Sequence, residues 1–166
     1  RNGNAGVQLE SISLSDDSIS MEISSSAFVE NRMIPSKYTC DGENTNPPIS
    51  ISGVPEGAKS LALIVDDPDA PKGTWTHWIM WSIDPATTEI PEAGAPAGAI
   101  EGVTSFGKVG YGGPCPPSGT HRYFFKLYAL DTMLDHGTDK QKSDVEAAME
   151  GHVLAEAQLV GLYHRE

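Results

Sequence analysis

Two histidines in similar local surroundings are the residues of this chain best suited to chemistry. Trp75 and His77 stand two positions apart, and so do His121 and Tyr123. Because side chains alternate along a strand, each pair shares one face of an extended segment. Two imidazoles that face one pocket offer four N–H donors when protonated and two when neutral. The pattern predicts a site for a phosphate or carboxylate, with a satisfied structural histidine as the alternative for either residue alone.

A second group of polar residues follows directly after the apolar run at 61–65. Asp66, Asp67 and Asp69 leave that run, and the prolines at 68 and 71 hold the residues before them extended. Three acids beside the end of a buried strand predict that at least one turns inward, to backbone N–H groups or to a histidine. The alternative is a capped turn whose carboxylates all face water.

The two cysteines, Cys40 and Cys115, each lie in a loop rich in Gly and Pro. An even count permits one disulfide, with two free, half-buried thiols as the alternative. Cys115, His121 and Asp67 also contain the residue types of a thiol hydrolase. His77, His121 and Asp67 could instead form a metal site of two histidines and one carboxylate. Spacing establishes neither catalytic arrangement, so both remain alternatives to simple binding.

Short apolar segments predict the elements that must position these side chains. A helix is predicted over 143–153, where Ser143 can act as the N-cap and Glu146 stands in capping-box position. The segment 155–163 fits a final strand or a strand–helix hybrid. Strands without regular intervening helices favour an antiparallel sheet system. The predicted strands lie within 19–24, 49–53, 61–65, 75–83 and 121–130, and the Gly/Pro-rich loops within 34–48, 85–99 and 111–119.

Length and charge limit the class of protein. The chain has 166 residues, which fits one domain, and a formal net charge of −12 with no basic cluster. A field of that sign repels nucleic acid and anionic membrane surfaces, so neither is an expected partner. No segment is apolar for long enough to cross a bilayer. We predict a loose tail over 1–18 and one folded domain over 19–166, and the start at Arg1 predicts that an N-terminal segment has been removed.

Several separate motifs occur in a specific order along the chain. The strongest are Asp67-Pro68-Asp69-Ala70-Pro71, Trp75-x-His77, and Gly113-Pro114-Cys115-Pro116-Pro117 followed by His121-Arg122-Tyr123. Together they resemble the phosphatidylethanolamine-binding protein family, also called Raf-kinase-inhibitor-like proteins. The resemblance spans about residues 26–165, and Ile34-Pro35, Cys40-Asp41-Gly42 and Asn46-Pro47-Pro48 resemble the prokaryotic branch. It implies a mainly-β fold, an antiparallel β-sandwich with a large central sheet, a smaller sheet and few short helices.

The resemblance also implies a role for each residue of a pocket at one end of the strands. Asp67 matches the acid at the pocket floor, and His77 and His121 match two imidazoles. Tyr123 matches the hydroxyl group, and Asp69 matches a second acid that braces the loop. The walls and the rim of the pocket are matched by Pro71, Trp75, Pro116 and Pro117.

The function implied is non-enzymatic binding of a small anion, such as phosphate, phosphoethanolamine or a carboxylate, without cofactor or metal. The alternative is a regulator that binds another protein, such as a kinase or a protease, although the sequence names no partner. Exported prokaryotic relatives carry cysteines in both regions, which favours a Cys40–Cys115 disulfide and an extracytoplasmic location. The chain ends at Glu166 without the C-terminal helix of many eukaryotic relatives, so we expect a more open pocket.

Overall fold

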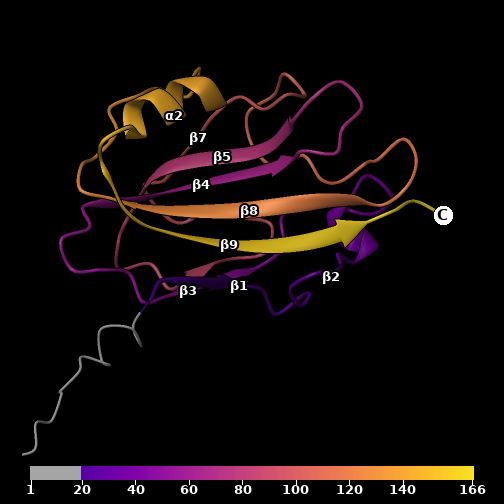
Figure 1. The fold of residues 1–166 in the computed structure, drawn as a ribbon, viewed down its shortest axis with the longest axis horizontal. Coiled ribbons are helices and arrows are strands. Elements are labelled where there is room, and N and C mark those ends of the chain that lie inside the picture. The colour runs from indigo at the N-terminus through magenta and orange to yellow at the C-terminus, as the bar shows by residue number, and fades with distance from the viewer. Residues whose placement is uncertain (1–19) are drawn as a thin grey trace, which may run out of the picture.

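The computed structural model describes residues 20–166. Within this range the chain is mainly β, with a large sheet, a small sheet and one short α-helix (Figure 1), which confirms that part of the prediction. The tail predicted over 1–18 and the first residue of the strand predicted at 19–24 lie outside the described residues. From residue 20 onward, no helix has the length and apolar character needed to span a membrane.

The large sheet is built around β4, whose two neighbours both run antiparallel to it. β4 (Ser60–Asp67) pairs with β5 (Trp75–Ile83) on one side and with β8 (His121–Leu130) on the other. The C-terminal end of β4 therefore lies beside the first residues of β5 and β8. The order across the sheet is β2-β9-β8-β4-β5-β7. The remaining members are β9 (Val153–Tyr163) and two short edge strands, β2 (Arg32–Met33) and β7 (Ile100–Glu101).

One edge of the large sheet corrects the expectation of wholly antiparallel pairing. β2 runs parallel to β9, with Arg32 opposite Gly161. The N–H of Ile34 then donates to the carbonyl of Leu162 at 2.7 Å. A Cβ atom on Gly161 would lie 2.6 Å from Ile34, so this crossing depends on a glycine in β9. Two residues are too few to show a hydrophobic period, so the sequence carried no signal for β2.

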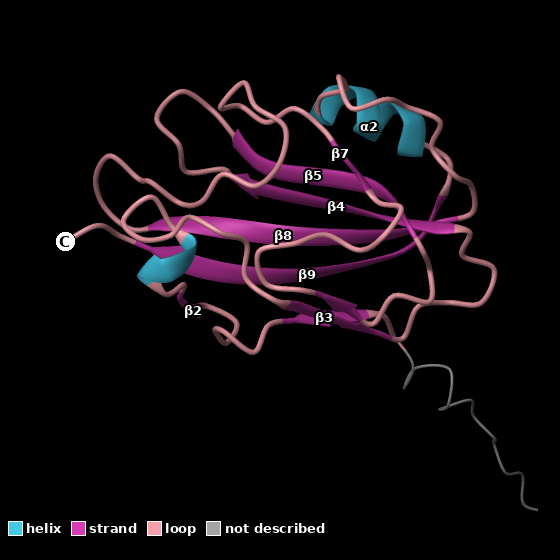
Figure 2. Cartoon of the chain, turned by 180° about the vertical axis from the view of Figure 1, so that it is seen from behind, coloured by secondary structure: helices cyan, strands magenta, loops and turns pink. Residues whose placement is uncertain are grey.

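The small sheet shares one hydrophobic core with the large sheet. Its strands have the order β1-β3-β6 and pair antiparallel. Ile23 and Ile51 of the small sheet are buried in the same cluster as Leu63 and Leu127 of the large sheet. Figure 2 shows the small sheet and α2 on either side of the large sheet. The strands of the small sheet are β1 (Glu22–Ser24), β3 (Ile49–Ser52) and β6 (Glu89–Ile90).

The helix α2 (Lys142–Met149) covers the opposite face of the large sheet. Its buried residues Val145 and Met149 pack in a second cluster with Ile64 and Trp81. Residues of β4 alternate between the two clusters, and all of them are buried. This confirms the prediction that the run at 61–65 is a strand buried on both faces.

Both ends of the predicted helix are corrected. At the start, Asp144 rather than Glu146 provides the capping carboxylate, which accepts the Gln141 N–H at 3.0 Å. Ser143 lies inside the first turn and is not the N-cap. The helix ends before Gly151, whose φ of 83° turns the chain into β9. The segment that fitted a strand or a hybrid is therefore a strand along its whole length.

Candidate functional site

A cavity of about 290 Å³ lies where the end of β4 meets the beginnings of β5 and β8. Its walls are mostly apolar. All eight residues that the sequence analysis assigned to a ligand line this cavity, although their binding role stays a prediction. The lining residues are Asp67, Ala70, Pro71, Trp75, His77, Phe106, Cys115, Pro116, Pro117, His121 and Tyr123.

A β-bulge directs His77 into the cavity. Val65 of β4 pairs with Trp78 of β5, and the next residue, Asp66, pairs with Thr76. His77 is therefore the extra residue of β5, and such an insertion re-aims a side chain. On a regular strand, the burial of Trp78 in the core cluster would send His77 to the opposite face. The bulge lets neighbouring residues face the same side of the sheet.

The ring of His77 is fixed by a backbone carbonyl. Its Nδ1 lies 2.7 Å from the oxygen of Gly112. A carbonyl oxygen only accepts, so Nδ1–H is the donor and Nε2 is left for the cavity. Burial lowers the pKa of His77 below its usual range, against the opposing effects of the Gly112 carbonyl and the Asp67 charge. The rings of Phe106 and Tyr123 meet the imidazole edge-on at 5.3 and 5.2 Å.

The second imidazole is held by the acid at the cavity floor. Nδ1 of His121 lies 2.6 Å from Oδ2 of Asp67, and both side chains are buried. Oδ1 of Asp67 accepts the backbone N–H of Asp69 at 2.7 Å. The carboxylate therefore fixes the orientation of His121 and leaves Nε2 as the ring nitrogen available to the cavity.

Tyr123 contributes a hydroxyl group that no other described residue satisfies. The residue is 1% exposed, and its hydroxyl oxygen makes no hydrogen bond of acceptable geometry within residues 20–166, although the Asp67 carboxylate lies near enough to affect the phenol. Burial raises the pKa of this phenol above its usual range, and the negative charge of Asp67 raises it further. The hydroxyl therefore remains protonated at neutral pH and can donate to a ligand.

The three acids after the apolar run have three separate sets of partners. Asp67 meets a histidine inside the cavity, as described above. Asp69 forms a two-pronged ion pair with Arg122, with Nε–Oδ2 and Nη2–Oδ1 distances of 2.9 and 2.8 Å, and Arg122 lowers the pKa of Asp69 to about 2. Asp66 points to the other face and accepts Nζ of Lys126 and Lys142 at 3.2 and 2.7 Å. Asp69 thus braces the loop after β4 against β8.

Phe106 is a wall residue that sequence reasoning missed. Its ring packs edge-on against Trp75 at 5.5 Å, and both side chains are about 40% exposed at the cavity mouth. The loop that carries it is tied to the edge of β5, because Ser105 N–H donates to Thr76 O at 3.0 Å and Ser105 Oγ accepts Thr76 N–H at 2.8 Å. An aromatic residue in an irregular loop has no period that could have identified it.

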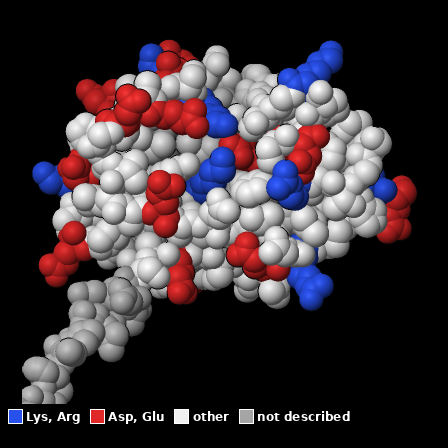
Figure 3. All heavy atoms as spheres, in the orientation of Figure 1, with Lys and Arg blue, Asp and Glu red and all other residues white. Residues whose placement is uncertain are grey.

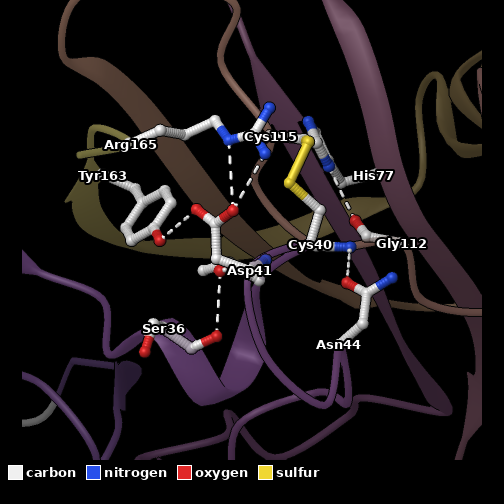
Figure 4. Close-up of a disulfide and its surroundings, with 11 residues drawn as sticks. Ser36, Cys40, Asp41, Asn44, His77, Gly112, Cys115, Tyr163 and Arg165 are labelled. Carbon is white, nitrogen blue, oxygen red and sulfur yellow. Dashed lines mark hydrogen bonds and ion pairs between the residues drawn. A yellow bond between two sulfur atoms is a disulfide. The ribbon is translucent and has the colours of Figure 1, made fainter.

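A disulfide joins Cys40 to Cys115 (Figure 4), and Cys115 is one of the residues that line the cavity. It joins two loops that are also held by hydrogen bonds. Cys40 N–H donates to Pro114 O at 3.1 Å, and Gly113 N–H donates to Oδ1 of Asn44 at 2.8 Å. Figure 4 shows the imidazole of His77 beside this junction, bonded to Gly112 of the same loop. The junction therefore positions the carbonyl that orients His77.

The positions of these side chains bear on the two catalytic alternatives, a thiol hydrolase and a metal site of two histidines and one carboxylate. The sulfur of Cys115 is part of the disulfide and is not a thiolate nucleophile in this state. No three His, Cys, Asp or Glu side chains of the described chain are grouped so that they could hold a metal ion.

The charges around the site offer little to offset an anion. Among residues 20–166, no Lys or Arg lines the cavity, and the lining includes the carboxylate of Asp67. Acidic side chains are scattered over the face drawn in Figure 3, with basic groups lying among them. Acidic residues outnumber basic ones in the chain, which has a formal net charge of −12.

The fold and the site define a mainly-β, two-sheet domain with a small His/Asp/aromatic cavity at its strand ends. Residues 24–164 match the family model described as phosphatidylethanolamine-binding protein. The chain therefore belongs to the phosphatidylethanolamine-binding protein family, in its prokaryotic branch, as predicted.

Curated proteins and solved structures that resemble this chain match it over most of its length and over nearly all of their own. A UPF0098 protein of Methanothermobacter thermautotrophicus is 57% identical over 150 residues, which are 87% of this chain and 99% of that protein. The structure of a phosphatidylethanolamine-binding protein homologue from Chlamydia trachomatis is 41% identical with a TM-score of 0.86, covering 89% of this chain and 99% of that one. The structure of E. coli YbcL, described as a new member of the mammalian family, is 31% identical with a TM-score of 0.83. The match covers 88% of this chain and 99% of YbcL.

Proposed function

We propose that the protein binds a small oxyanion, such as a phosphorylated head group, without converting it chemically. One observation carries the proposal. The cavity beside β4 gathers three polar groups whose hydrogen-bonding capacity is not used by other described residues: Nε2 of His77, Nε2 of His121 and the hydroxyl of Tyr123. In a mostly apolar cavity, a ligand that completes these hydrogen bonds is favoured.

The size of the cavity and the family support a head group rather than a larger molecule. A volume of about 290 Å³ lies at the low end for small-molecule sites, which run from about 300 to 1,000 Å³. The family is described by its binding of phosphatidylethanolamine, whose head group carries a phosphate. The residues proposed to contact the ligand are Asp67, Pro71, Trp75, His77, Pro116, Pro117, His121 and Tyr123, with Asp69 in support.

Calorimetric titration with phosphoethanolamine tests the proposal, using two His→Asn variants as a matched pair. His121→Asn keeps a donor toward Asp67 but removes Nε2 from the cavity, so its affinity should fall at least about tenfold. His152→Asn makes the same change in an exposed pair, where Nδ1 of His152 lies 2.7 Å from Oδ1 of Asp131. This control should bind like the wild type. Wild-type affinity in His121→Asn, or no binding by the wild type at millimolar phosphoethanolamine, would contradict the proposal.

A further inference from the structure

The outer edge of β9 is covered over only part of its length. β2 pairs with Gly161 and Leu162, and the residue before β2 reaches Val160, whose carbonyl accepts the Asn31 N–H at 2.7 Å. Figure 1 shows β9 along the border of the large sheet, with the short β2 beside its C-terminal end. Among residues 20–166, no strand covers the stretch 155–159 on this side.

The backbone of this stretch carries hydrogen-bonding groups that the described chain does not pair. The carbonyl of Val160 points away from β8, because it accepts an N–H from the β2 side. The pairing of β9 with β8 is regular over 155–163, and the direction of the N–H and C=O groups alternates along a strand. The N–H and C=O groups of Glu156 and Gln158 therefore also point away from β8. They have no backbone partner within residues 20–166.

The side chains along this edge differ between the two faces of the sheet. On one face, Ala155 and Ala157 are partly buried against the core that the two sheets share. Because alanine is small, a further strand at this edge can place larger apolar side chains beside them. On the other face, Glu156 borders a shallow hollow of about 430 Å³ with Lys126 and Tyr128 of β8. An added strand would therefore meet an apolar face and a polar face.

The polar face is acidic. Glu156 is exposed, and it takes part in none of the ion pairs formed within residues 20–166. Lys126, the basic residue of the hollow, is already paired with the buried Asp66 at 3.2 Å. Burial raises the pKa of Tyr128 to about 12, and the negative charge of Glu156 adds to the rise. A second copy of the chain would bring another net charge of −12 to this edge, whereas a basic segment is attracted to it.

We infer that the stretch 155–159 is a docking edge for an extended segment of another protein, in which apolar residues alternate with Lys or Arg. The segment adds a strand to the large sheet and pairs with the backbone of Glu156 and Gln158. Its basic side chains lie on the face of Glu156, because opposite charges on neighbouring strands attract, and its apolar side chains lie beside Ala155 and Ala157. The edge shares no residue with the cavity at the end of β4, so this inference does not depend on the proposed function.

Amide hydrogen exchange of the whole chain tests whether the edge is open. The amides of Glu156 and Gln158 should exchange at least about a hundredfold faster than those of Ala157 and Leu159, which point toward β8. Slow exchange of Glu156 and Gln158 at every protein concentration would show that the chain itself covers the edge. Protection that grows with protein concentration would show that a second copy covers it. Either result would overturn the inference.

A probe peptide, acetyl-Lys-Val-Lys-Val-Lys-Val-Lys-amide, tests binding when it is titrated into the isotope-labelled chain and followed by NMR. The amide signals of 155–159 should shift, and those of the cavity lining should not. The same peptide methylated at every backbone nitrogen should bind at least about tenfold more weakly, because it cannot donate to the edge carbonyls. A peptide with Glu in place of Lys should bind at least about two- to fivefold more weakly, because its charges repel Glu156.

Each contrary result removes one part of the inference. Equal affinity of the methylated peptide would exclude strand addition, and equal affinity of the Glu peptide would exclude selection of basic segments. Shifts confined to the cavity lining would place the peptide at a different site. Absence of binding by the Lys peptide at millimolar concentration would overturn the inference while leaving the proposed function untouched.

Two variants and a matched control locate the interaction. Glu156→Gln should weaken binding of the Lys peptide about two- to fivefold, because a cross-strand charge pair is lost. The control Glu89→Gln changes an exposed acid of β6, where Glu89 accepts Oγ of Ser50 at 3.1 Å, and should bind like the wild type. Gln158→Pro removes an outward N–H without removing a bond to β8, and should weaken binding about three- to tenfold.

Unchanged affinity in both variants would overturn the assignment to this edge. If the proline variant does not fold, the methylated peptide tests the same backbone hydrogen bonds from the side of the partner.

Discussion

The hydroxyl of Tyr123 is buried at the cavity wall and lacks a partner within the described chain. A buried hydroxyl without a hydrogen bond reduces stability, whereas the same group in contact with a ligand contributes to affinity. Tyr111 provides the contrast in the same part of the molecule, because its hydroxyl donates to the carbonyl of Tyr38 at 2.7 Å. The Tyr111 hydroxyl therefore has a partner in the fold, whereas the Tyr123 hydroxyl has none among the described residues and is proposed to contact the ligand.

Removing each hydroxyl should give opposite results. Tyr123→Phe should leave the free energy of unfolding unchanged or raise it by up to about 1 kcal/mol, and should weaken phosphoethanolamine binding about tenfold. Tyr111→Phe should lower the free energy of unfolding by about 1 kcal/mol, because it leaves the buried Tyr38 carbonyl without its donor. Urea unfolding and calorimetric titration measure the two quantities. A destabilised Tyr123→Phe variant with normal affinity would show that the hydroxyl serves the fold.

At the scale of the elements, sequence reasoning was strongest where a strand is long and apolar. The runs at 61–65, 75–83 and 121–130 became β4, β5 and β8, and antiparallel pairing then brought their predicted site residues to one edge. The i, i+2 spacing placed Trp75 and His77 together at the cavity. These features depend on local periodicity and on adjacent pairing, which a single sequence contains.

Other features depend on contacts between distant segments. The pairing of β2 with β9 requires the close approach of Ile34 to Gly161, which no local pattern indicates. The bulge at His77 is visible only when β5 is laid against β4. The Gly112 carbonyl and the ring of Phe106 come from irregular loops whose course is set by their docking. The side chains that line the cavity, and an aspartate turned toward a histidine, were therefore predictable from the sequence, whereas the Gly112 carbonyl and the ring of Phe106 were not.

The attachment of α2 to the sheet provides a test at this scale. Asp66 is 1% exposed and meets Lys142, the first residue of α2, and Lys126 of β8. Lys142→Met should lower the free energy of unfolding by about 1 kcal/mol, because Lys126 still compensates the carboxylate. The double variant Lys126→Met/Lys142→Met should cost about 3 kcal/mol or more, because it leaves a buried charge alone. Urea unfolding measures both losses.

A third variant checks that the loss comes from the isolated charge. Adding Asp66→Leu to the double variant removes the buried carboxylate, so most of the lost stability should return. A double variant that loses no more than twice the unfolding free energy that Lys142→Met loses would show that the pairing contributes only ordinary surface packing. An Asp66→Leu substitution that restores none of the lost free energy would show the same.

At the scale of the whole molecule, the cavity rim is tied to both halves of the chain. The disulfide joins Cys40 to Cys115 across 75 residues. The neighbouring Asp41 accepts the hydroxyl of Tyr163 at 2.6 Å and Nη2 of Arg165 at 3.0 Å, so the end of the chain is anchored at the same place (Figure 4). The loop that orients His77 is thus tied directly to the segment 40–44, which is tied in turn to Tyr163 and Arg165.

Removing the disulfide should reduce stability far more than affinity. Closing a loop of 75 residues restricts the unfolded chain, so the double variant Cys40→Ser/Cys115→Ser should lose about 4 kcal/mol of unfolding free energy on the chain-entropy account. The hydrogen bonds from Cys40 N–H to Pro114 and from Gly113 N–H to Asn44 use backbone donors that survive the substitutions. They should keep the loop and the Gly112 carbonyl in place, so phosphoethanolamine affinity measured well below the melting temperature should stay close to that of the wild type. The wild type under reducing conditions should match the variant in stability. If affinity collapses while the variant is still folded, the covalent link rather than the hydrogen bonds positions His77.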